Sequence, residues 1–491
     1  MPEAYLLAID QGTTNTKVII VNERGEVVAQ ASKAVNISFP QPAWVEQDAL
    51  EIWQSVRDAL AACLAQVKVT ISTIGISNQR ESVLLWERKT GRPLGPVVTW
   101  QCRRSSAFCQ QLEAQGLGEF LHQRSGLGID PLFSGSKGRW LLEHHNAQRR
   151  AEAGEICLGT VDSWLLYQLT GGKAHKTDVT NASRTQLFNL KTLDWDDELL
   201  AIFNIPRPAL AEIQPSSSRF AESVALAELP AGIPIMGVIG DSHGALFGQA
   251  GFEQGSVKAT YGTGSSLMTP TANLVQSEKG LSSTIAWGLK TGVTYALEGN
   301  ISSTGAAITW LVELLQLDSP SALSNLASLV ESSEGVNFVP AFVGLGAPHW
   351  NDKARGLITG LTRGSKREHL ARAGLDSIAF QIRDVFEVMA KEAKSALKLL
   401  MADGGASSND SLMQIQADTL GIPVLRNRSA HLSALGAAYL AGLELGIWRN
   451  LIEIKQLPRQ RDQFEPHSNV RRDEAYKLWK AAVQRSMFGL S

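Results

Sequence analysis

The sequence predicts an α/β protein in which two domains of similar design hold a ligand in the cleft between them. Residues 6–21 have the pattern of a strand, a glycine turn and a strand, and residues 255–268 repeat it. Alternating helical and strand patterns follow each of these hairpins, which is typical of an α/β domain. The length of 491 residues also suits several domains, because one domain takes up about 150 residues. Glycine turns from both domains would then meet at the cleft.

The composition is that of a globular protein with no strong charge preference. Hydrophobic residues make up 44% and charged residues 19%, and 46 basic against 48 acidic side chains give a net charge of −2. Such a balance creates no field that would attract nucleic acid or a membrane surface. The four cysteines are scattered without a CxxC pair, which disfavours a disulfide scaffold or a zinc site. With no signal-peptide pattern and no apolar run of about 18 residues, we expect a cytoplasmic protein.

The first hairpin carries side chains that suit a phosphate group and a metal ion. An apolar strand ends on Asp10, Gly12 stands at the tip of the turn, and Lys17 precedes the next apolar run. Glycine keeps backbone N–H groups accessible to an anion, and an aspartate oxygen suits Mg²⁺. Short side chains between them add donors, namely Thr13, Thr14, Asn15 and Thr16. The spacing matches neither a Walker A loop nor a dinucleotide-binding motif, so an ordinary surface hairpin is the alternative.

The rest of the first half alternates between helix and strand. A helix is expected from Asp48 to about Gln66, because apolar residues recur there at helical spacing. These apolar residues are Leu50, Trp53, Val56, Leu60 and Leu64. Strands are expected at 25–31, 69–76, 82–86, 97–100 and 235–241, and helices at about 105–150, 162–170 and 244–248. Polar residues follow three of these strands, at Arg80-Glu81, at Gln101 and at Asp241.

The second half repeats the opening pattern. Its first hairpin has a Gly/Thr turn at 262–264 but no aspartate at the end of the first strand. A later strand at 398–402 ends on Asp403 and two glycines. Helices are expected at 303–315, 410–420, 436–446 and 472–487. The third of these helices is rich in glycine and alanine, so it can pack very close to its neighbour.

A series of motifs resembles, in order, those of the FGGY carbohydrate kinases, and within that family the chain is most similar to glycerol kinases. The similarity extends from Leu6 to Trp448. The motifs include Asp10-Gln11-Gly12-Thr13-Thr14, Asn78-Gln79-Arg80-Glu81, Gly240-Asp241, Tyr261-Gly262-Thr263-Gly264 and Asp403-Gly404-Gly405-Ala406. The resemblance implies two actin-like, ribonuclease-H-like α/β domains that close on ATP and a sugar or polyol, with a catalytic cleft between them.

The same resemblance implies a division of the chain. Residues 1–249 are expected to form an N-terminal domain with the substrate site and the first phosphate loop. Residues 250–450 are expected to form a C-terminal, nucleotide-binding domain, followed by a helical extension at 451–491. A homo-oligomer, either a dimer or a tetramer, is expected by analogy with glycerol kinases.

The resemblance assigns the chemistry to Asp241. This residue would act as the general base, taking the proton from a substrate hydroxyl as that oxygen attacks the γ-phosphorus of ATP. Arg80 and Glu81 would hold other substrate hydroxyls as donor and acceptor, and Trp100 would form an apolar wall. Each assignment has a structural alternative. Asp241 would be a helix N-cap, Arg80 and Glu81 an exposed salt bridge, and Trp100 a core tryptophan.

The nucleotide site is also assigned by resemblance. The first phosphate loop would consist of Thr13, Thr14, Asn15 and Lys17, and the second would contain Gly262 and Thr263. Positions that hold the base and the α-phosphate region correspond to Gly305, Thr309, Gly405 and Asn409. Asp10 would organise Mg²⁺. As an alternative, Gly305 would be a packing glycine in a helix.

Four positions depart from the glycerol kinase pattern around the acceptor site. Leu132 replaces a tyrosine that binds glycerol, and Ser266 replaces a phenylalanine that lines the same site. Ser242 replaces a glutamine, and Cys102 replaces an aspartate. The smaller side chains widen the pocket, and the loss of a hydroxyl partner alters specificity. We therefore expect a polyol or ketose of four to five carbons, phosphorylated at a terminal hydroxyl.

Two alternatives stay open at this point. The chain is a glycerol kinase in the strict sense, or it is a non-catalytic, actin-like sugar sensor that binds without turnover. Asp10, Asp241 and both glycine turns disfavour the sensor, since a sensor needs no base. His243 either donates to an added substrate oxygen or is a structural histidine of its helix.

Overall fold

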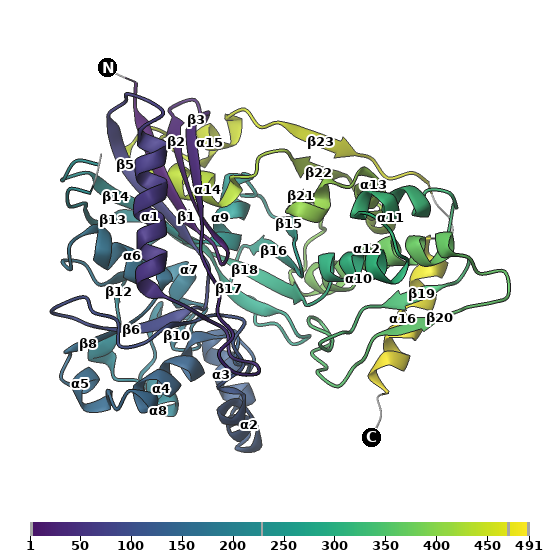
Figure 1. The fold of residues 1–491 in the computed structure, drawn as a ribbon, viewed down its shortest axis with the longest axis horizontal. Helices are drawn as coiled ribbons and strands as arrows, with labels where there is room; N and C mark the ends of the chain where they lie inside the picture. Colours follow the sequence, from purple (N-terminus) through teal and green to yellow (C-terminus); the bar gives the residue numbers. More distant parts are fainter. Residues whose placement is uncertain (1–2, 227–228, 469–471, 489–491) are drawn as a thin grey trace.

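Two mixed β-sheets, one in each half of the chain, organise the computed structural model (Figure 1). The structure describes residues 3–226, 229–468 and 472–488. Helices cover the sheets and fill the space between them, so the α/β class predicted from the sequence is confirmed. The two sheets share one pattern of strands.

The first sheet is built on the predicted hairpin. Strands β1 (Tyr5–Gln11) and β2 (Asn15–Asn22) are antiparallel. β1 is parallel to β5 (Ile71–Asn78), which in turn is parallel to β14 (Pro234–Gly240). The edges are β3 (Val27–Ala34) and β13 (Ser217–Glu222). Because β1, β5 and β14 are parallel, the polar residues at their carboxyl ends meet at one edge of the sheet.

The second sheet repeats this arrangement. Strands β15 (Ser256–Tyr261) and β16 (Ser265–Thr271) form the second hairpin, and β18 (Gly292–Ile301) continues it antiparallel to β16. β15 is parallel to β21 (Leu399–Asp403), which is parallel to β22 (Val424–Asn427). The edges are β17 (Ser282–Leu289) and β23 (Arg461–Phe464). Three antiparallel strands followed by two parallel ones thus occur twice. The repeated sequence pattern predicted the hairpin that opens each set.

Helix α1 (Ala49–Leu64) begins where the sequence indicated, with Asp48 as its N-cap. Ile52 and Val56 lie on its buried face, but Leu50, expected on that face, is 56% exposed. The buried face of the helix includes Ala49 in place of Leu50. The small residues Ala49, Ser55 and Ala59 are buried together with Ile52 and Val56 and complete the helical spacing.

The other elements of the first half surround the sheet or form a smaller sheet beneath it. The smaller sheet consists of β4 (Glu46–Gln47), β7 (Val97–Val98), β6 (Val83–Glu87) and β8 (Ile156–Thr160). The helices are α2 (Ser106–Ala114), α3 (Gly118–Ser125), α4 (Ser134–His144), α5 (Gln148–Glu152), α6 (Val161–Leu169), α7 (Val179–Ala182), α8 (Asp197–Phe203) and α9 (Asp241–Gly248).

In the second half, a long helix α12 (Arg367–Glu392) lies at the centre of the helical layer. Its neighbours are α10 (Gly305–Leu314), α11 (Pro320–Ala327), α13 (Asp410–Leu420) and α16 (Arg472–Met487). Residues 451–491 were expected to be a helical extension, yet they also supply β23 between α15 (Leu451–Gln456) and α16. Asp384 of α12 fixes α16 by accepting from Tyr476 Oη (2.6 Å) and Trp479 Nε1 (3.0 Å).

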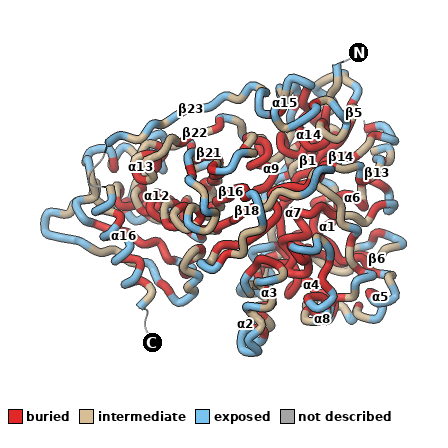
Figure 2. The backbone as a smooth tube through the Cα atoms, turned by 180° about the vertical axis from the view of Figure 1, so that it is seen from behind, coloured by how far each residue is buried: buried red, intermediate tan, exposed pale blue. Residues whose placement is uncertain are grey.

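Helix α14 (Leu432–Leu445) comes from the second half of the chain but packs against the first sheet. It contacts β1, β5, β14 and α9, and Figures 1 and 2 both show it beside those strands. A Cβ atom on Gly75 would lie 2.4 Å from the Ala437 carbonyl oxygen, and one on Gly237 would lie 2.5 Å from it. Only glycine allows this approach, which agrees with the close packing predicted for the small-residue helix.

Within the described residues, none of the helices combines the length and the apolar character that crossing a membrane requires. All four cysteines are buried and carry free thiols.

Candidate active site

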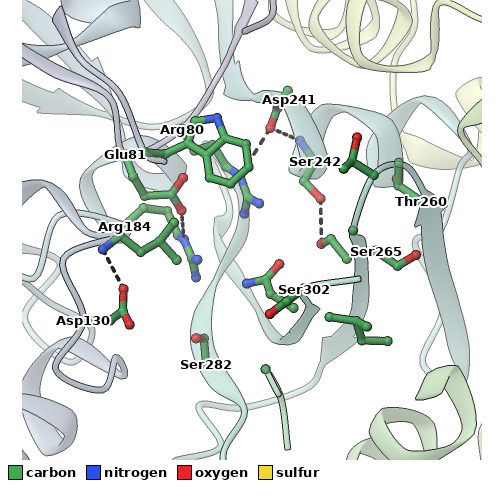
Figure 3. A pocket seen from close by; sticks show the side chains of 18 of the residues that line it. Arg80, Glu81, Asp130, Arg184, Asp241, Ser242, Thr260, Ser265, Ser282 and Ser302 are labelled. Carbon is green, nitrogen blue, oxygen red and sulfur yellow. Dashed lines mark hydrogen bonds and ion pairs between the residues drawn. The ribbon is translucent and has the colours of Figure 1, made fainter. Parts of the chain in front are cut away.

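A cleft between the two halves of the chain collects most of the residues that the sequence marked as functional. It lies at the carboxyl ends of the parallel strands and is lined by both glycine turns and the start of α9. The predicted site residues that line it are Thr13, Thr14, Lys17, Arg80, Glu81, Trp100, Leu132, Asp241, Ser242, Thr263, Ser266 and Gly405. Figure 3 shows Arg80, Glu81, Asp241 and Ser242 grouped around this cavity.

The two hairpin turns enter the cleft in the same way. The N–H of Gly12 donates to the Asn15 carbonyl oxygen, and the N–H of Gly262 donates to the Gly264 carbonyl oxygen. Both distances are 2.9 Å. Thr14 and Thr263 are exposed at the tips of the turns. Their hydroxyl groups are short donors that lose little entropy when they bind an anion.

Lys17 adds a positive charge to the first turn, but from strand β2 rather than from the turn itself. It pairs with Asp10 in the hairpin register, and its Nζ donates to the carbonyl oxygen of Ala430 (3.3 Å). The contact joins the first turn to the segment that precedes α14. Lys17 thereby lies where the two halves of the chain meet.

Asp10 has the properties of a metal ligand. Its Oδ1 atom is buried and has no hydrogen-bond partner among the described residues. Burial raises the pKa of Asp10 to about 6; the carboxylate of Asp241 adds to the rise, and Lys17 opposes it. A cation such as Mg²⁺ would satisfy the free oxygen and favour the ionised form. The residue therefore fits a magnesium site.

Asp241 is the first residue of α9, directly after strand β14. Gly240 is the N-cap of this helix, so Asp241 is not the capping residue that the structural alternative suggested. The Asp241 Oδ1 atom accepts from the N–H of Ser242 (2.6 Å) and lies 3.3 Å from Nε of Arg80. Burial raises the pKa of Asp241, although Arg80 opposes the rise. A raised pKa suits a group that accepts a proton during a reaction.

Arg80 and Glu81 belong to a buried network of charges rather than to an exposed salt bridge. Arg80 Nη1 lies 2.8 Å from Oε1 of Glu298, and Arg184 lies 2.6 Å from Glu81 and 2.8 Å from Glu298. Arg184 and Glu298 are fully buried. Burial alone would raise the pKa of Glu298, but Arg184 and Arg80 hold it well below its usual range. Glu298 therefore stays ionised and fixes two arginines of the other half.

Arg184, Glu298 and Lys258 belong to this network or adjoin it, but they were not among the residues predicted from the sequence. The available signal was a charged residue inside an apolar run, as for Lys258 between Val257 and Ala259. A charge in a strand that is otherwise buried needs a partner, and such partners often belong to a functional site.

Trp100 and Leu132, predicted to contact the acceptor, both line the cleft. Trp100 is not a core tryptophan, because it is 37% exposed, and its Nε1 donates to Thr13 Oγ1 (2.9 Å). The N–H of Leu132 donates to Asp130 Oδ1 (2.7 Å), and Nζ of the buried Lys137 donates to the Leu132 carbonyl oxygen. The Trp100 contact links the acceptor wall to the first phosphate turn.

Ser242 and Ser266 lie side by side at the acceptor end, with their Oγ atoms 3.2 Å apart. Lys258 Nζ donates to Ser242 Oγ (2.7 Å), and Ser266 Oγ donates to Glu298 Oε1 (2.9 Å). His243 is fully buried, and its Nε2 lies 3.5 Å from Thr284 Oγ1. Burial lowers the pKa of His243 well below its usual value, which fits the structural histidine rather than a substrate donor.

Five other residues predicted to bind the nucleotide are not part of the cleft lining, namely Asn15, Gly262, Gly305, Thr309 and Asn409. Gly305 N–H donates to the Gly262 carbonyl oxygen (3.0 Å), and a Cβ atom on Gly305 would lie 2.5 Å from that oxygen. Gly305 therefore packs α10 against the second turn. Thr309 is exposed one helical turn further on, and Asn409 caps α13 by accepting from the N–H of Leu412 (3.1 Å).

Comparison with known proteins shows what the chain is similar to. The model of the N-terminal domain of the FGGY family of carbohydrate kinases matches residues 5–248, and that of the C-terminal domain matches residues 257–445. A glycerol kinase of Listeria monocytogenes serotype 4a is 45% identical over 491 residues, which cover 99% of both chains. Glycerol kinase 2 of Thermotoga maritima is 47% identical over 493 residues, covering 98% of this chain and 99% of the other. The crystal structure of Plasmodium falciparum glycerol kinase with ADP aligns with a TM-score of 0.94 at 33% identity, over 99% of both chains.

Proposed function

The chain belongs to the FGGY family of carbohydrate kinases, and from this premise we propose that it transfers the γ-phosphoryl group of ATP to a terminal hydroxyl of a small polyol. The observation that carries the proposal is the meeting of Asp241 with both glycine turns in one cleft. The turns supply donors for phosphate oxygens, and Asp241 supplies a base at the acceptor end. A kinase needs both in one cavity.

In this proposal Asp241 removes the proton from the acceptor hydroxyl as that oxygen attacks the γ-phosphorus. Arg80 and Glu81 hold other hydroxyls of the acceptor as donor and acceptor of hydrogen bonds. Their buried partners, Arg184 and Glu298, restrict their movement and so keep the acceptor in a reactive orientation. Closure of the two halves would exclude water from the reacting phosphate.

On the nucleotide side, we assign the phosphates to Thr13, Thr14, Asn15, Lys17, Gly262 and Thr263. The base and the α-phosphate region are assigned to Gly305, Thr309, Gly405 and Asn409. Mg²⁺ at Asp10 would offset negative charge on the phosphates, and its assignment is supported by the buried, unpartnered Oδ1 atom.

Glycerol is the acceptor that the relatives support best. Proteins 45% and 47% identical to this chain are named glycerol kinases, which favours glycerol over the four- or five-carbon acceptor expected from the sequence. A longer polyol is the second candidate. It is favoured because Leu132, Ser242 and Ser266 all line the cleft.

ADP release with a panel of acceptors tests this proposal. Glycerol, erythritol, threitol, erythrulose, xylitol, ribulose and xylulose would each be supplied with ATP and Mg²⁺, and kcat/KM compared. We expect turnover with glycerol and with at least one other acceptor of the panel. Absence of turnover with every acceptor would contradict the kinase proposal and favour the sugar sensor.

The variant Asp241→Asn separates catalysis from binding. Loss of a general base costs about 10²- to 10⁴-fold in rate, so kcat should fall by about 10³-fold. Acceptor binding, measured by calorimetry with the best acceptor of the panel, should persist, because Arg80 and Glu81 are unchanged. A kcat within tenfold of the wild type would mean that another group removes the proton.

Assembly and location complete the proposal. Family likeness supports a homo-oligomer, and the composition supports a cytoplasmic location. Light scattering coupled to size exclusion would show a mass of at least twice 53.1 kDa if the chain self-associates.

A further inference from the structure

Lys258, Ser242, Ser266 and Glu298 form an unbroken series of hydrogen bonds, here called the hydroxyl chain, at the acceptor end of the cleft. Its links measure 2.7 Å from Lys258 to Ser242, 3.2 Å between the serines, and 2.9 Å from Ser266 to Glu298. The two ends are buried, at 1% exposure for Lys258 and 0% for Glu298. The two serines in the middle line the cleft.

The ends of the hydroxyl chain set the direction of its protons. A carboxylate only accepts hydrogen bonds, so Ser266 gives its single proton to Glu298. The Ser242 oxygen accepts from Lys258, which leaves the Ser242 proton to make the contact between the serines. This contact is the longest of the three. Ser242 is thus a donor that can turn to a ligand, and Ser266 then has a free lone pair.

We propose that Ser242 and Ser266 together bind one additional hydroxyl group of the acceptor, a subsite that rests on the proposed kinase function and deepens it. Two oxygens 3.2 Å apart can both contact a third oxygen at about 2.8 Å. A ligand hydroxyl would accept the proton of Ser242 and donate its own to Ser266. The two outer hydrogen bonds of the hydroxyl chain are then kept, and the contact between the serines is replaced by two hydrogen bonds to the ligand.

This arrangement selects a chemical class. A hydroxyl group both donates and accepts, whereas a carbonyl oxygen only accepts and would leave the Ser266 lone pair without a donor. The subsite therefore fits a sugar alcohol better than a ketose. In the proposed complex, one hydroxyl of glycerol reacts and the other two face Arg80 and Glu81. A fourth hydroxyl would then be the one that binds the serines. The subsite therefore favours a polyol of at least four carbons over glycerol, whereas the names of the relatives favour glycerol.

The test is a ratio of specificities in the intact enzyme. For the wild type, kcat/KM with the better of erythritol and threitol is divided by kcat/KM with glycerol, and erythrulose is measured alongside. We expect a ratio above one, and lower kcat/KM for erythrulose than for the tetritol. If kcat/KM is lower for erythritol, threitol and xylitol than for glycerol, the subsite is overturned and the kinase proposal stands. No turnover with any acceptor would overturn both.

Serine-to-alanine variants locate the effect. Ser242→Ala removes the donor and Ser266→Ala the acceptor, and each should lower the ratio by about tenfold. The double variant should lower it little further, because both serines bind the same hydroxyl. Ser106→Ala is the matched control, since Ser106 also lines the cleft but donates to the Arg103 carbonyl oxygen (2.6 Å). The shared subsite would be overturned if the ratio of each single variant is within twofold of that of the control. It would also be overturned if the effects of the two substitutions add in the double variant.

Discussion

The two sides of the cleft present their polar groups in opposite ways. The proposed nucleotide side consists of two glycine turns with exposed threonines, Thr14 and Thr263, at their tips. The proposed acceptor side consists of charged side chains that are buried and paired with one another, such as Arg80, Arg184 and Glu298.

The difference shows how recognition is divided within one cavity. A phosphate group is the same in every reaction, and exposed turns with local hydrogen bonds suffice to hold it. An acceptor must be oriented and distinguished from similar molecules, which requires side chains that cannot move. Because Glu298 comes from the second half and the arginines from the first, the acceptor side also joins the two halves of the protein.

If the acceptor side is held together by its buried charges, Glu298→Gln should have the largest effect on stability. The amide removes the charge shared by Arg80 and Arg184 and leaves them with Asp241 and Glu81 as their charged partners. Removing one member of a buried ion pair costs about 3–5 kcal/mol. The free energy of unfolding in guanidinium chloride measures this loss. The control Glu313→Gln alters an exposed glutamate of α10 and should change stability by less than about 0.5 kcal/mol. Equal losses in the two variants would show that the buried network does not stabilise the fold.

On the nucleotide side, the Asp10 site should lose Mg²⁺ in acid. The pKa of Asp10 is raised to about 6, so the ionised form that binds a cation is depleted as the pH falls below 6. At pH 5 the apparent affinity for Mg²⁺ should be about tenfold weaker than at pH 7.5, because metal and proton compete. Titration of the initial rate with Mg²⁺ at both pH values measures this. The variant Asp10→Asn is the control, because its pH dependence comes only from protons that ATP itself binds. If Mg²⁺ affinity in this variant depends on pH as in the wild type, the assignment of Mg²⁺ to Asp10 is contradicted.

Thr13 tests whether the two sides are independent, and the expected effect is the smallest. Its Oγ1 atom accepts from Trp100 of the proposed acceptor wall, whereas the Thr263 hydroxyl makes no hydrogen bond to that wall among the described residues. Thr13→Ala should raise KM for ATP and for the acceptor by about two- to tenfold each. Thr263→Ala should raise KM for ATP alone. An unchanged acceptor KM in Thr13→Ala would mean that the contact with Trp100 has no role in binding.

The two glycine turns were predictable from the sequence because the residues that define each turn are close together in the chain. A glycine, a few hydroxyl groups and an apolar strand on each side define a turn within about ten residues, and the structure forms both hairpins as predicted. The position of Asp241 at a strand end followed from the same reasoning. The repeated order of strands confirmed the two-domain design.

The acceptor side was only partly predictable because its pairs are distant in sequence. Arg80 and Glu81 were identified through their motif, but Arg184 and Glu298 have no local pattern that indicates their partners. Likewise Leu50 has the spacing of a buried residue, yet neighbouring small residues occupy the packed stripe. These outcomes depend on which elements meet in three dimensions, and no short stretch of sequence encodes that.

We expect helix α14 to complete the packing of the first sheet late in the synthesis of the chain. Strand β1 ends at Gln11 and α14 begins at Leu432, so about 420 residues are made between two elements that pack together. At about 5–20 residues per second, this takes about 20 to 80 s. In the later part of that time, once β14 has been made, the strand surface around Gly75 and Gly237 stays uncovered. The first half of the chain therefore completes its core only when nearly the whole polypeptide has been synthesised.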